Sequence, residues 1–155
     1  MNFKKSYLIL LGLCLFLLGT GLPLAAQNLA LGKNVTVSTV ETGSFLAPYA
    51  VDGNSQTRWA SLYTDPQYIY VDLVDIYDID RVVLDWEAAY ATEYKVQVSN
   101  DAVNWIDIYH DTSGNGGTDD LSITGTGRYV RMLGLQRVTQ WGYSLWEFEV
   151  YGTLS

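Results

Sequence analysis

Short segments in which apolar and polar residues alternate are the feature that most constrains the fold of this chain. In residues 68–73 the apolar Ile69, Val71 and Leu73 occupy every second position, as in a strand with one buried face. We expect strands at residues 35–38, 68–73, 79–86, 94–98, 105–109, 128–133 and 145–151. No window of a dozen residues keeps the 3.6-residue apolar period of a helix. The pattern therefore predicts an all-β protein with two packed antiparallel sheets, a β-sandwich.

The amino-terminal segment has the pattern of a secretion signal. Lys4 and Lys5 form a short basic region, residues 7–18 are almost continuously apolar, and Ala25 and Ala26 offer small residues to a signal peptidase. A membrane anchor is the alternative, but a spanning helix needs roughly 20 apolar residues. We therefore predict a signal peptide over residues 1–26 and one domain over residues 27–155. The protein would be secreted, extracellular or periplasmic, and would not insert in a membrane after cleavage.

Cysteine use and charge narrow the function. Cys14 is the only cysteine and falls within the predicted signal, so the mature domain is expected to rely on its apolar core or on a metal. Removing Lys4 and Lys5 leaves seven basic residues against 17 acidic ones, a net charge of −10. Phosphate groups bind to cationic surfaces, so this acidity argues against nucleic acid and anionic lipid as partners. It is compatible with cation binding.

The sequence lacks the residues expected of a catalytic centre. His110 is the only histidine, and the mature chain has no cysteine nucleophile. Three serines have no base near them in sequence: Ser61, Ser99 and Ser144. Asp119 and Asp120 are neighbouring carboxylates, but their glycine-rich segment, residues 114–125, favours a solvated turn over a glycosidase pair. We predict that the protein is not an enzyme.

Residues 49–59, with the sequence YAVDGNSQTRW, form the most informative loop. Asp52, Asn54 and Thr57 place three oxygen ligands around a tight turn, and Gly53 lets the backbone curl so that carbonyl groups can join them. Hard cations such as Ca²⁺ take six to eight such oxygens. An EF-hand is excluded, because the twelfth position of its loop would be Tyr63. From these residues alone, a plain Asx turn is an equal alternative.

Several sequence blocks, in a fixed order, resemble a known family. Residues 28–152 resemble an F5/8 type C (discoidin) domain, and most of all a family 32 carbohydrate-binding module. The blocks are residues 28–33 (NLALGK), 50–54 (AVDGN), 57–59 (TRW), 67–73 (QYIYVDL), 94–101 (YKVQVSND), 127–131 (GRYVR) and 146–152 (WEFEVYG). The resemblance implies an eight-stranded, galactose-binding-domain-like jelly roll. It also implies a structural Ca²⁺ held by the carbonyls of Tyr49 and Trp146 and the side chains of Asp52, Asn54, Thr57 and Glu147. Such a site would join an early loop to the last strand, in place of a disulfide.

Members of this family bind ligands on loops at one end of the sandwich, and three such loops here are rich in aromatic residues: residues 60–65, 87–92 and 136–143. Sugar rings pack on aromatic faces, and their hydroxyls bind carboxylates, amides and guanidinium groups. Trp141 fits best, and we expect Gly142 to give its loop the freedom to expose the ring; a packed loop anchor is an equal alternative. The predicted sugar-binding residues are Glu41, Tyr63, Glu87, Tyr90, Arg137, Gln140 and Trp141. The other tryptophans, Trp59, Trp86, Trp105 and Trp146, are expected in the core.

The sequence thus predicts a secreted, non-catalytic carbohydrate-binding module that binds a glycan or polysaccharide, beside a glycoside hydrolase acting on the same substrate. Ala60 stands where some galactose-binding members carry histidine, and Glu87 where some carry arginine, so a glucan or another neutral polysaccharide is as good a ligand as galactose. The alternative function is a cell-surface adhesion module for a protein or lipid headgroup. It ranks lower because the loops are acidic and Arg137 is almost alone among them as a basic residue.

Overall fold

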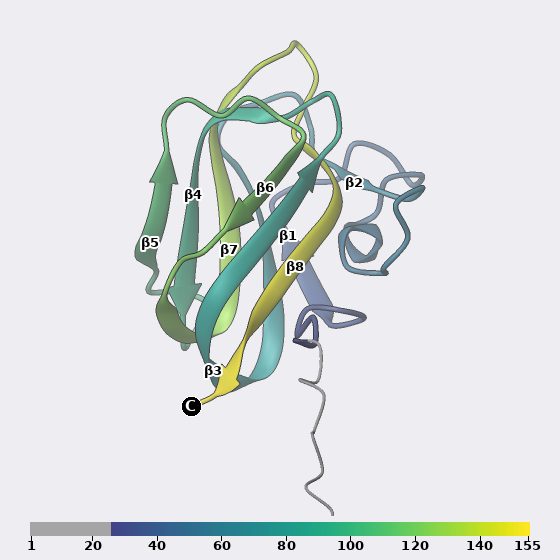
Figure 1. Ribbon diagram of the computed structural model, residues 1–155. Coiled ribbons are helices and arrows are strands. Elements are labelled where there is room, and N and C mark those ends of the chain that lie inside the picture. Colours follow the sequence, from purple (N-terminus) through teal and green to yellow (C-terminus); the bar gives the residue numbers. More distant parts are fainter. Residues whose placement is uncertain (1–25) are drawn as a thin grey trace, which may run out of the picture.

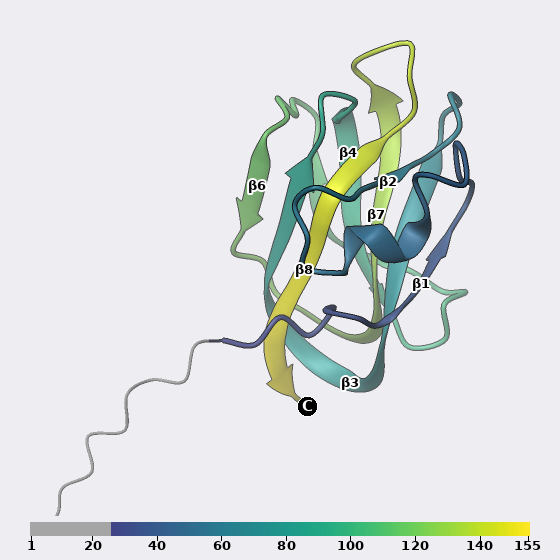
Figure 2. The same ribbon diagram turned by 90° about the vertical axis from the view of Figure 1, so that its right-hand side faces the viewer.

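The chain folds into an antiparallel β-sandwich, described here by a computed structural model for residues 26–155; the predicted signal peptide, except Ala26, lies outside the described residues. The strands are β1 (Asn34–Val37), β2 (Trp59–Ala60), β3 (Gln67–Trp86), β4 (Ala91–Ser99), β5 (Ile106–Asp111), β6 (Thr118–Leu121), β7 (Gly125–Arg137) and β8 (Ser144–Leu154) (Figure 1). A single 3-10 turn, η1 (Ala47–Ala50), lies beside β8 (Figure 2). No helix within residues 26–155 is long and apolar enough to cross a membrane.

The long strand β3 belongs to both layers of the sandwich. Its first part, residues 67–72, pairs with β1 and β7, and its second part, residues 77–86, pairs mainly with β6 and β8. The bend between them contains Val74, whose φ of 80° is unusual for a β-branched residue. The Asp72 side chain accepts a hydrogen bond from the Val74 amide at 2.8 Å and holds this conformation. The strands predicted at residues 68–73 and 79–86 are therefore one bent element.

The core fills the space between the layers with the inward residues of each strand. Ile69, Val71 and Leu73 are buried, as their alternation predicts. Trp59 and Trp86 are also buried, whereas Trp105 and Trp146 are only half-buried. Burying one large apolar side chain contributes about 1.5–3 kcal/mol. No cysteine lies within residues 26–155, so this packing stabilises the described domain without disulfides.

The glycine-rich segment around Asp119 and Asp120 is not the solvated turn that its composition predicts. It contains β6, which pairs with β3, and Asp119 accepts hydrogen bonds from the Trp86 indole at 2.8 Å and the Tyr94 hydroxyl at 2.6 Å. Asp120 forms an ion pair with Arg81 at 2.6 Å. The strand alternates exposed and half-buried residues, so its apolar signal is weak. Both carboxylates have structural partners.

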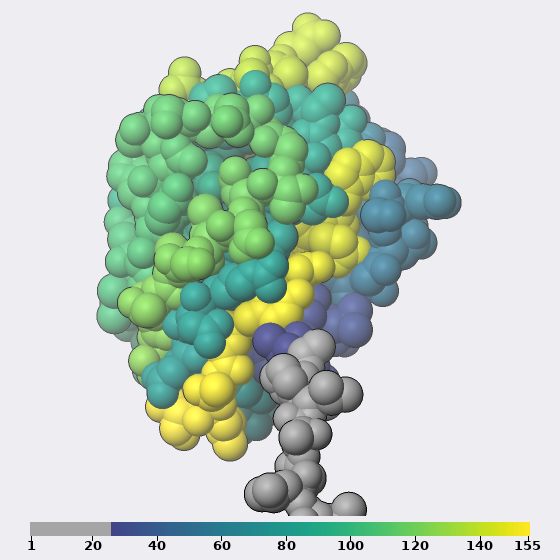
Figure 3. All heavy atoms as spheres, in the orientation of Figure 1, coloured from purple at the N-terminus to yellow at the C-terminus, as the bar shows by residue number. Residues whose placement is uncertain are grey.

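Four segments meet at the end of the sandwich away from the carboxyl terminus (Figure 1). They are residues 38–46, 60–66, 87–90 and 138–143. Backbone hydrogen bonds hold them together: Ser61 N to Tyr143 O at 2.9 Å, Ser144 N to Ala89 O at 2.9 Å, and Glu87 N to Ser144 O at 3.0 Å. The β7–β8 loop, residues 138–143, projects furthest at this end (Figure 3).

Candidate functional site

A cleft of about 440 Å³ opens between these loops. It is lined by Glu41, Arg58, Ala60, Glu87, Ala88, Ala89, Thr139, Trp141, Gly142, Tyr143 and Ser144. The structure thus brings together three of the predicted sugar-binding residues, Glu41, Glu87 and Trp141, from loops far apart in sequence. A space of this size accommodates a small ligand or part of a chain.

An exposed tryptophan forms one wall of the cleft. The Trp141 side chain is 52% exposed, and its ring meets the edge of the Tyr63 ring at a centroid distance of 5.4 Å and an interplanar angle of 81°. The Tyr63 hydroxyl donates to Glu41 Oε1 at 2.5 Å, and this hydrogen bond raises the pKa of Tyr63. Tyr63 therefore links the aromatic wall to a carboxylate, although it is not itself a lining residue.

Two carboxylates and one guanidinium group give the cleft its charge. Glu87 Oε2 accepts a hydrogen bond from the Ala89 amide at 3.0 Å, which fixes the side chain at the start of its loop. Arg58 donates from Nη1 to Ser144 Oγ at 2.7 Å and lies 3.8 Å above the Phe45 ring. Sequence reasoning missed Arg58 as a cleft residue, because it falls inside the TRW block that identifies the fold. Its place in the sequence, beside Asp52, Asn54 and Thr57, does not indicate where its side chain points.

Besides Tyr63, three of the predicted sugar-binding residues do not line the cleft. The Tyr90 ring packs under Gly116, where an added Cβ would lie 2.5 Å from Tyr90 Cδ1. Arg137 makes an ion pair with Asp65 at 3.1 Å. Gln140 is exposed at the loop tip and offers its backbone carbonyl to Arg137.

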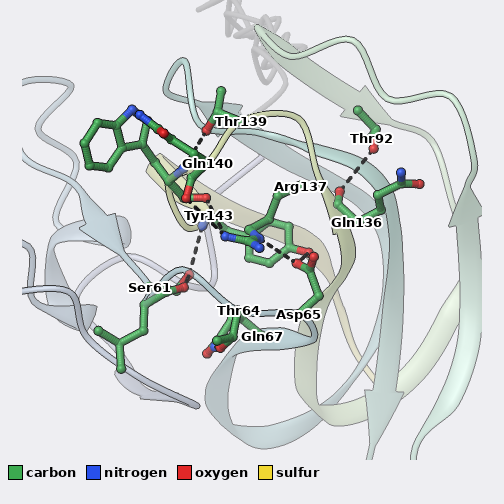
Figure 4. A network of polar contacts seen from close by, with 12 residues as sticks. Ser61, Thr64, Asp65, Gln67, Thr92, Gln136, Arg137, Thr139, Gln140 and Tyr143 are labelled. Carbon is green, nitrogen blue, oxygen red and sulfur yellow. Dashed lines mark hydrogen bonds and ion pairs between the residues drawn. The ribbon is translucent and has the colours of Figure 1, made fainter.

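The floor beneath the Trp141 loop is a network of polar contacts (Figure 4). Tyr143 is fully buried; its amide donates to Ser61 Oγ at 2.8 Å, and its hydroxyl donates to Asp65. Burial, together with this hydrogen bond, raises the pKa of Tyr143. A Cβ on Gly142 would lie 2.2 Å from the Ser61 carbonyl oxygen. Gly142 therefore allows a close backbone contact with Ser61, while the neighbouring Trp141 ring is exposed.

The loop of residues 49–59, which carries the predicted Ca²⁺ ligands Asp52, Asn54 and Thr57, is folded around Asp52. Thr57 Oγ1 donates to Asp52 at 2.8 Å, the Asn54 amide donates to Asp52 Oδ1 at 2.9 Å, and the Gln56 amide donates to Asn54 Oδ1 at 3.1 Å. These are the contacts of an Asx turn. The structure therefore brings Asp52, Asn54 and Thr57 together. No group of three or more His, Cys, Asp and Glu side chains in the described part of the chain is placed to hold a metal.

Glu147 is the unusual residue beside this loop. It is only 7% exposed, and neither carboxylate oxygen has a hydrogen-bond partner among the described residues. Burial, with repulsion from Asp52, raises the pKa of Glu147 to about 7; the amides of Asn54 and Gly53 are near enough to lower this pKa in part, but neither makes a well-formed hydrogen bond to the carboxylate. A buried carboxylate without a partner is costly. A cation facing Glu147 and Asp52 would remove that cost, so the residues present fit a hard metal ion.

A two-layer antiparallel jelly roll with a cleft between the loops of one end defines a galactose-binding-domain-like β-sandwich. The family model for the F5/8 type C domain matches residues 34–148, and the chain belongs to this family. A curated relative is the polysaccharide lyase 8 family protein HylA of Enterococcus faecalis, 30% identical over 131 residues. That alignment covers 78% of this chain but only 10% of HylA, so the chain spans about a tenth of the curated relative.

Solved structures resemble the domain over nearly their whole length. Chitosan-binding module 1 from the chitosanase/glucanase of Paenibacillus sp. IK-5 is 52% identical, with a TM-score of 0.79 over 81% of this chain and 99% of its own. Chitosan-binding module 2 of the same enzyme, solved with chitotriose, is 48% identical, with a TM-score of 0.79 over 81% and 100% of the two chains. A CBM32 module of Clostridium perfringens, 23% identical with a TM-score of 0.73 over 81% and 100%, shares the fold.

Proposed function

We propose that this protein is a non-catalytic carbohydrate-binding module for chains of β-1,4-linked glucosamine, the sugar of chitosan. The observation that carries the proposal is the pairing of two carboxylates, Glu41 and Glu87, with the exposed Trp141 in one cleft. The sugar ring would pack on the indole, and its protonated amino group would bind a carboxylate. The likeness to two chitosan-binding modules, at 52% and 48% identity, supports this ligand.

The cleft holds two carboxylates against the one guanidinium of Arg58, and this excess of negative charge favours an amino sugar over the neutral polysaccharide that the sequence also allowed. A protonated amine beside a carboxylate makes a charge-assisted hydrogen bond, which is about twice as strong as a neutral one. The mature chain's charge of −10 would also attract a polycation from a distance. Glu87 stands where some galactose-binding members carry arginine, and that exchange of charge suits the same change of ligand.

Three trisaccharides with the same linkage test the proposed ligand by isothermal titration calorimetry. Trimers of glucosamine, N-acetylglucosamine and glucose differ only in the group at C2, which is an ammonium, an acetamide or a hydroxyl. We expect the glucosamine trimer to bind at least tenfold more tightly than the other two, equivalent to about 1.4 kcal/mol. Equal or tighter binding of the glucose trimer would contradict the proposal.

The same titrations test the absence of catalysis, since we expect each trisaccharide to be recovered intact. Ser61 and Ser144 are buried. His110 lies on the surface beside Glu93 at 2.9 Å, away from the cleft-lining residues. His110 is therefore separated from Ser144, the serine that lines the cleft, and no serine–histidine pair faces the ligand.

Truncating Trp141 to alanine is expected to lower affinity for the glucosamine trimer about tenfold, because a stacked ring contributes on the order of 1 kcal/mol. The melting temperature should change little, since the indole is 52% exposed. A core anchor would instead cost about 3–5 kcal/mol on truncation. Calorimetry beside thermal melts separates the two roles, and unchanged affinity in a folded Trp141→Ala protein would remove the ring from the site.

We further propose a structural Ca²⁺ between the Asp52 loop and β8. Its ligands would be the side chains of Asp52, Asn54, Thr57 and Glu147 and the carbonyls of Tyr49 and Trp146. Two carboxylates with amide, hydroxyl and carbonyl oxygens match the preference of Ca²⁺ for oxygen ligands. When bound, the ion would neutralise the buried charge of Glu147 and join an early loop to the last strand.

Removing Ca²⁺ with a chelator is expected to lower the melting temperature. An ion at 100 times its dissociation constant stabilises the folded state by about 2.7 kcal/mol, or roughly 10 °C for a domain of this size. Glu147→Gln should melt at the same temperature with and without Ca²⁺, and above the chelated wild type, because the buried charge is gone. A chelator-independent melt of the wild type, with no metal by elemental analysis, would rule out the site.

The proposed ligand also bears on where the protein acts and on the enzyme that acts beside it. We propose that residues 1–26 direct secretion and that the module acts beside a glycoside hydrolase on the same polysaccharide. The relatives support this, because the two chitosan-binding modules derive from a chitosanase/glucanase. No observation on the structure favours a protein or lipid headgroup as the ligand.

A further inference from the structure

The Trp141 side chain has few contacts that could fix its position. Its ring is half exposed and touches one other ring, the edge of Tyr63, which is itself 42% exposed. The Trp141 amide donates only to the nearby Thr139 Oγ1, at 3.1 Å. The direction of the indole therefore depends on the backbone of residues 138–142, and something must hold that backbone.

Arg137 holds it from below. As the last residue of β7, it directs its guanidinium back under the loop, where Nη1 donates to the carbonyls of Gln140 at 3.3 Å and Trp141 at 3.2 Å. Its Nε donates to Asp65 Oδ1 at 3.1 Å, across to the loop before β3 (Figure 4). One planar group thus binds two carbonyls of its own loop and a carboxylate of another.

Asp65 is in turn fixed to the core. Its Oδ1 also accepts a hydrogen bond from the hydroxyl of Tyr143, whose ring is buried against Gly134 of β7. The side chains of Arg137 and Asp65 are 20% and 34% exposed, so water screens their attraction only in part. The ion pair therefore connects the projecting loop to a buried part of the sandwich.

We propose that Arg137 and Asp65 are positioning residues that set the Trp141 loop in its ligand-binding conformation before the ligand arrives. This inference rests on the proposed function, because it assigns to Arg137 an indirect part in sugar binding in place of the direct contact that sequence reasoning predicted. A loop ordered in advance loses less entropy on binding, which raises affinity without adding a contact to the ligand. The guanidinium is needed because two of its nitrogens, Nε and Nη1, reach the three acceptors from fixed positions in one plane, whereas the donors of a lysine share a single nitrogen on a flexible stem.

Hydrogen exchange of the ligand-free protein tests the positioning directly. In Arg137→Ala the amides of Trp141 and Tyr143 should exchange at least tenfold faster, while amides of β4 and β7 keep their wild-type rates. Arg137→Lys should behave like Arg137→Ala, because lysine keeps the positive charge but lacks the planar guanidinium group. The matched control is Arg81→Ala, which breaks another arginine–aspartate pair, at 2.6 Å, on β3 and β6. It should leave the Trp141 loop unchanged.

Titration with the glucosamine trimer tests whether Arg137 affects binding through Trp141 or by contacting the sugar itself. Arg137→Ala should lower affinity roughly five- to tenfold in the wild-type background. In the Trp141→Ala background it should lower affinity less than twofold, because the ring it positions is gone. Additive losses would show direct contact and overturn the proposal, as would wild-type exchange rates in Arg137→Ala. If the wild type binds no trimer, the proposed ligand fails, and the exchange rates still decide whether Arg137 holds the loop.

Discussion

Replacing both Glu41 and Glu87 by glutamine is expected to lower affinity for the glucosamine trimer about 100-fold. Each substitution keeps the size and a hydrogen-bond acceptor but removes the negative charge that faces an ammonium group. A hydrogen bond to a charged partner is worth about 1.5–3 kcal/mol, so each single change should cost roughly tenfold or more. Calorimetry on the two single variants and the double variant measures the losses and any coupling between them.

The control for this charge effect is Asp75→Asn, an exposed carboxylate in the bend of β3 at the opposite end of the domain. It changes the net charge by the same amount as one glutamate substitution, so it reports the general attraction of an acidic protein for a cation. We expect it to alter affinity less than twofold at physiological salt. Affinity for the glucose trimer should not change in any of these variants. If Glu41→Gln and Glu87→Gln bind the glucosamine trimer as the wild type does, the carboxylates do not recognise the amine.

Substituting Gly142 by alanine is expected to have the largest effect on stability. The added Cβ would lie 2.2 Å from the Ser61 carbonyl oxygen and 2.8 Å from that of Leu62, and neither backbone atom can move aside cheaply. Overpacking costs about 1–3 kcal/mol, and displacing the loop would also weaken the hydrogen bonds between Ser61 and Tyr143. A total of about 2–4 kcal/mol corresponds to a fall of roughly 10 °C in melting temperature.

Gly43→Ala is the matched control, because Gly43 lies in a neighbouring loop and has nothing within 4 Å of an added Cβ. Its melting temperature should stay within a few degrees of the wild type. The Gly142→Ala variant should also bind the trimer more weakly, since Trp141 moves with the displaced loop. A Gly142→Ala protein that melts and binds as the wild type does would show that the 61–62 and 141–143 segments are free to separate.

The fold was largely predictable because alternation records which side of a strand is buried. The strand at Ile69, Val71 and Leu73 is the clearest case. Two errors have physical causes. The bend at Val74 interrupts the alternation and divides β3 into two apparent strands, and β6 has no buried residue to mark it. Pattern alone could not have recovered either element.

The cleft was predictable in part. Trp141, Glu41 and Glu87 were found because they lie in loops at the end where the family binds ligands, and because an aromatic ring beside polar groups suits a sugar. Arg137 has the same appearance in the sequence, yet its partner Asp65 is 72 residues away, and nothing local shows that its charge is already paired. Arg58 was missed for the opposite reason, since its block of sequence had already been assigned to the fold. Whether each of these residues lines the cleft depends on the direction of its side chain, and the spacing of residues in the sequence does not show that direction.

The bent strand β3 makes the two layers share one backbone. Neither layer can lose its pairing partner in β3 without disturbing the other, because residues 67–72 serve one layer and residues 77–86 serve the other. Unfolding should therefore be a single cooperative transition, with no state in which one layer persists alone. A ligand that binds only the native state, at the cleft or at the Asp52 loop, therefore stabilises the entire domain. Proteolysis of the native domain would then require this single global transition.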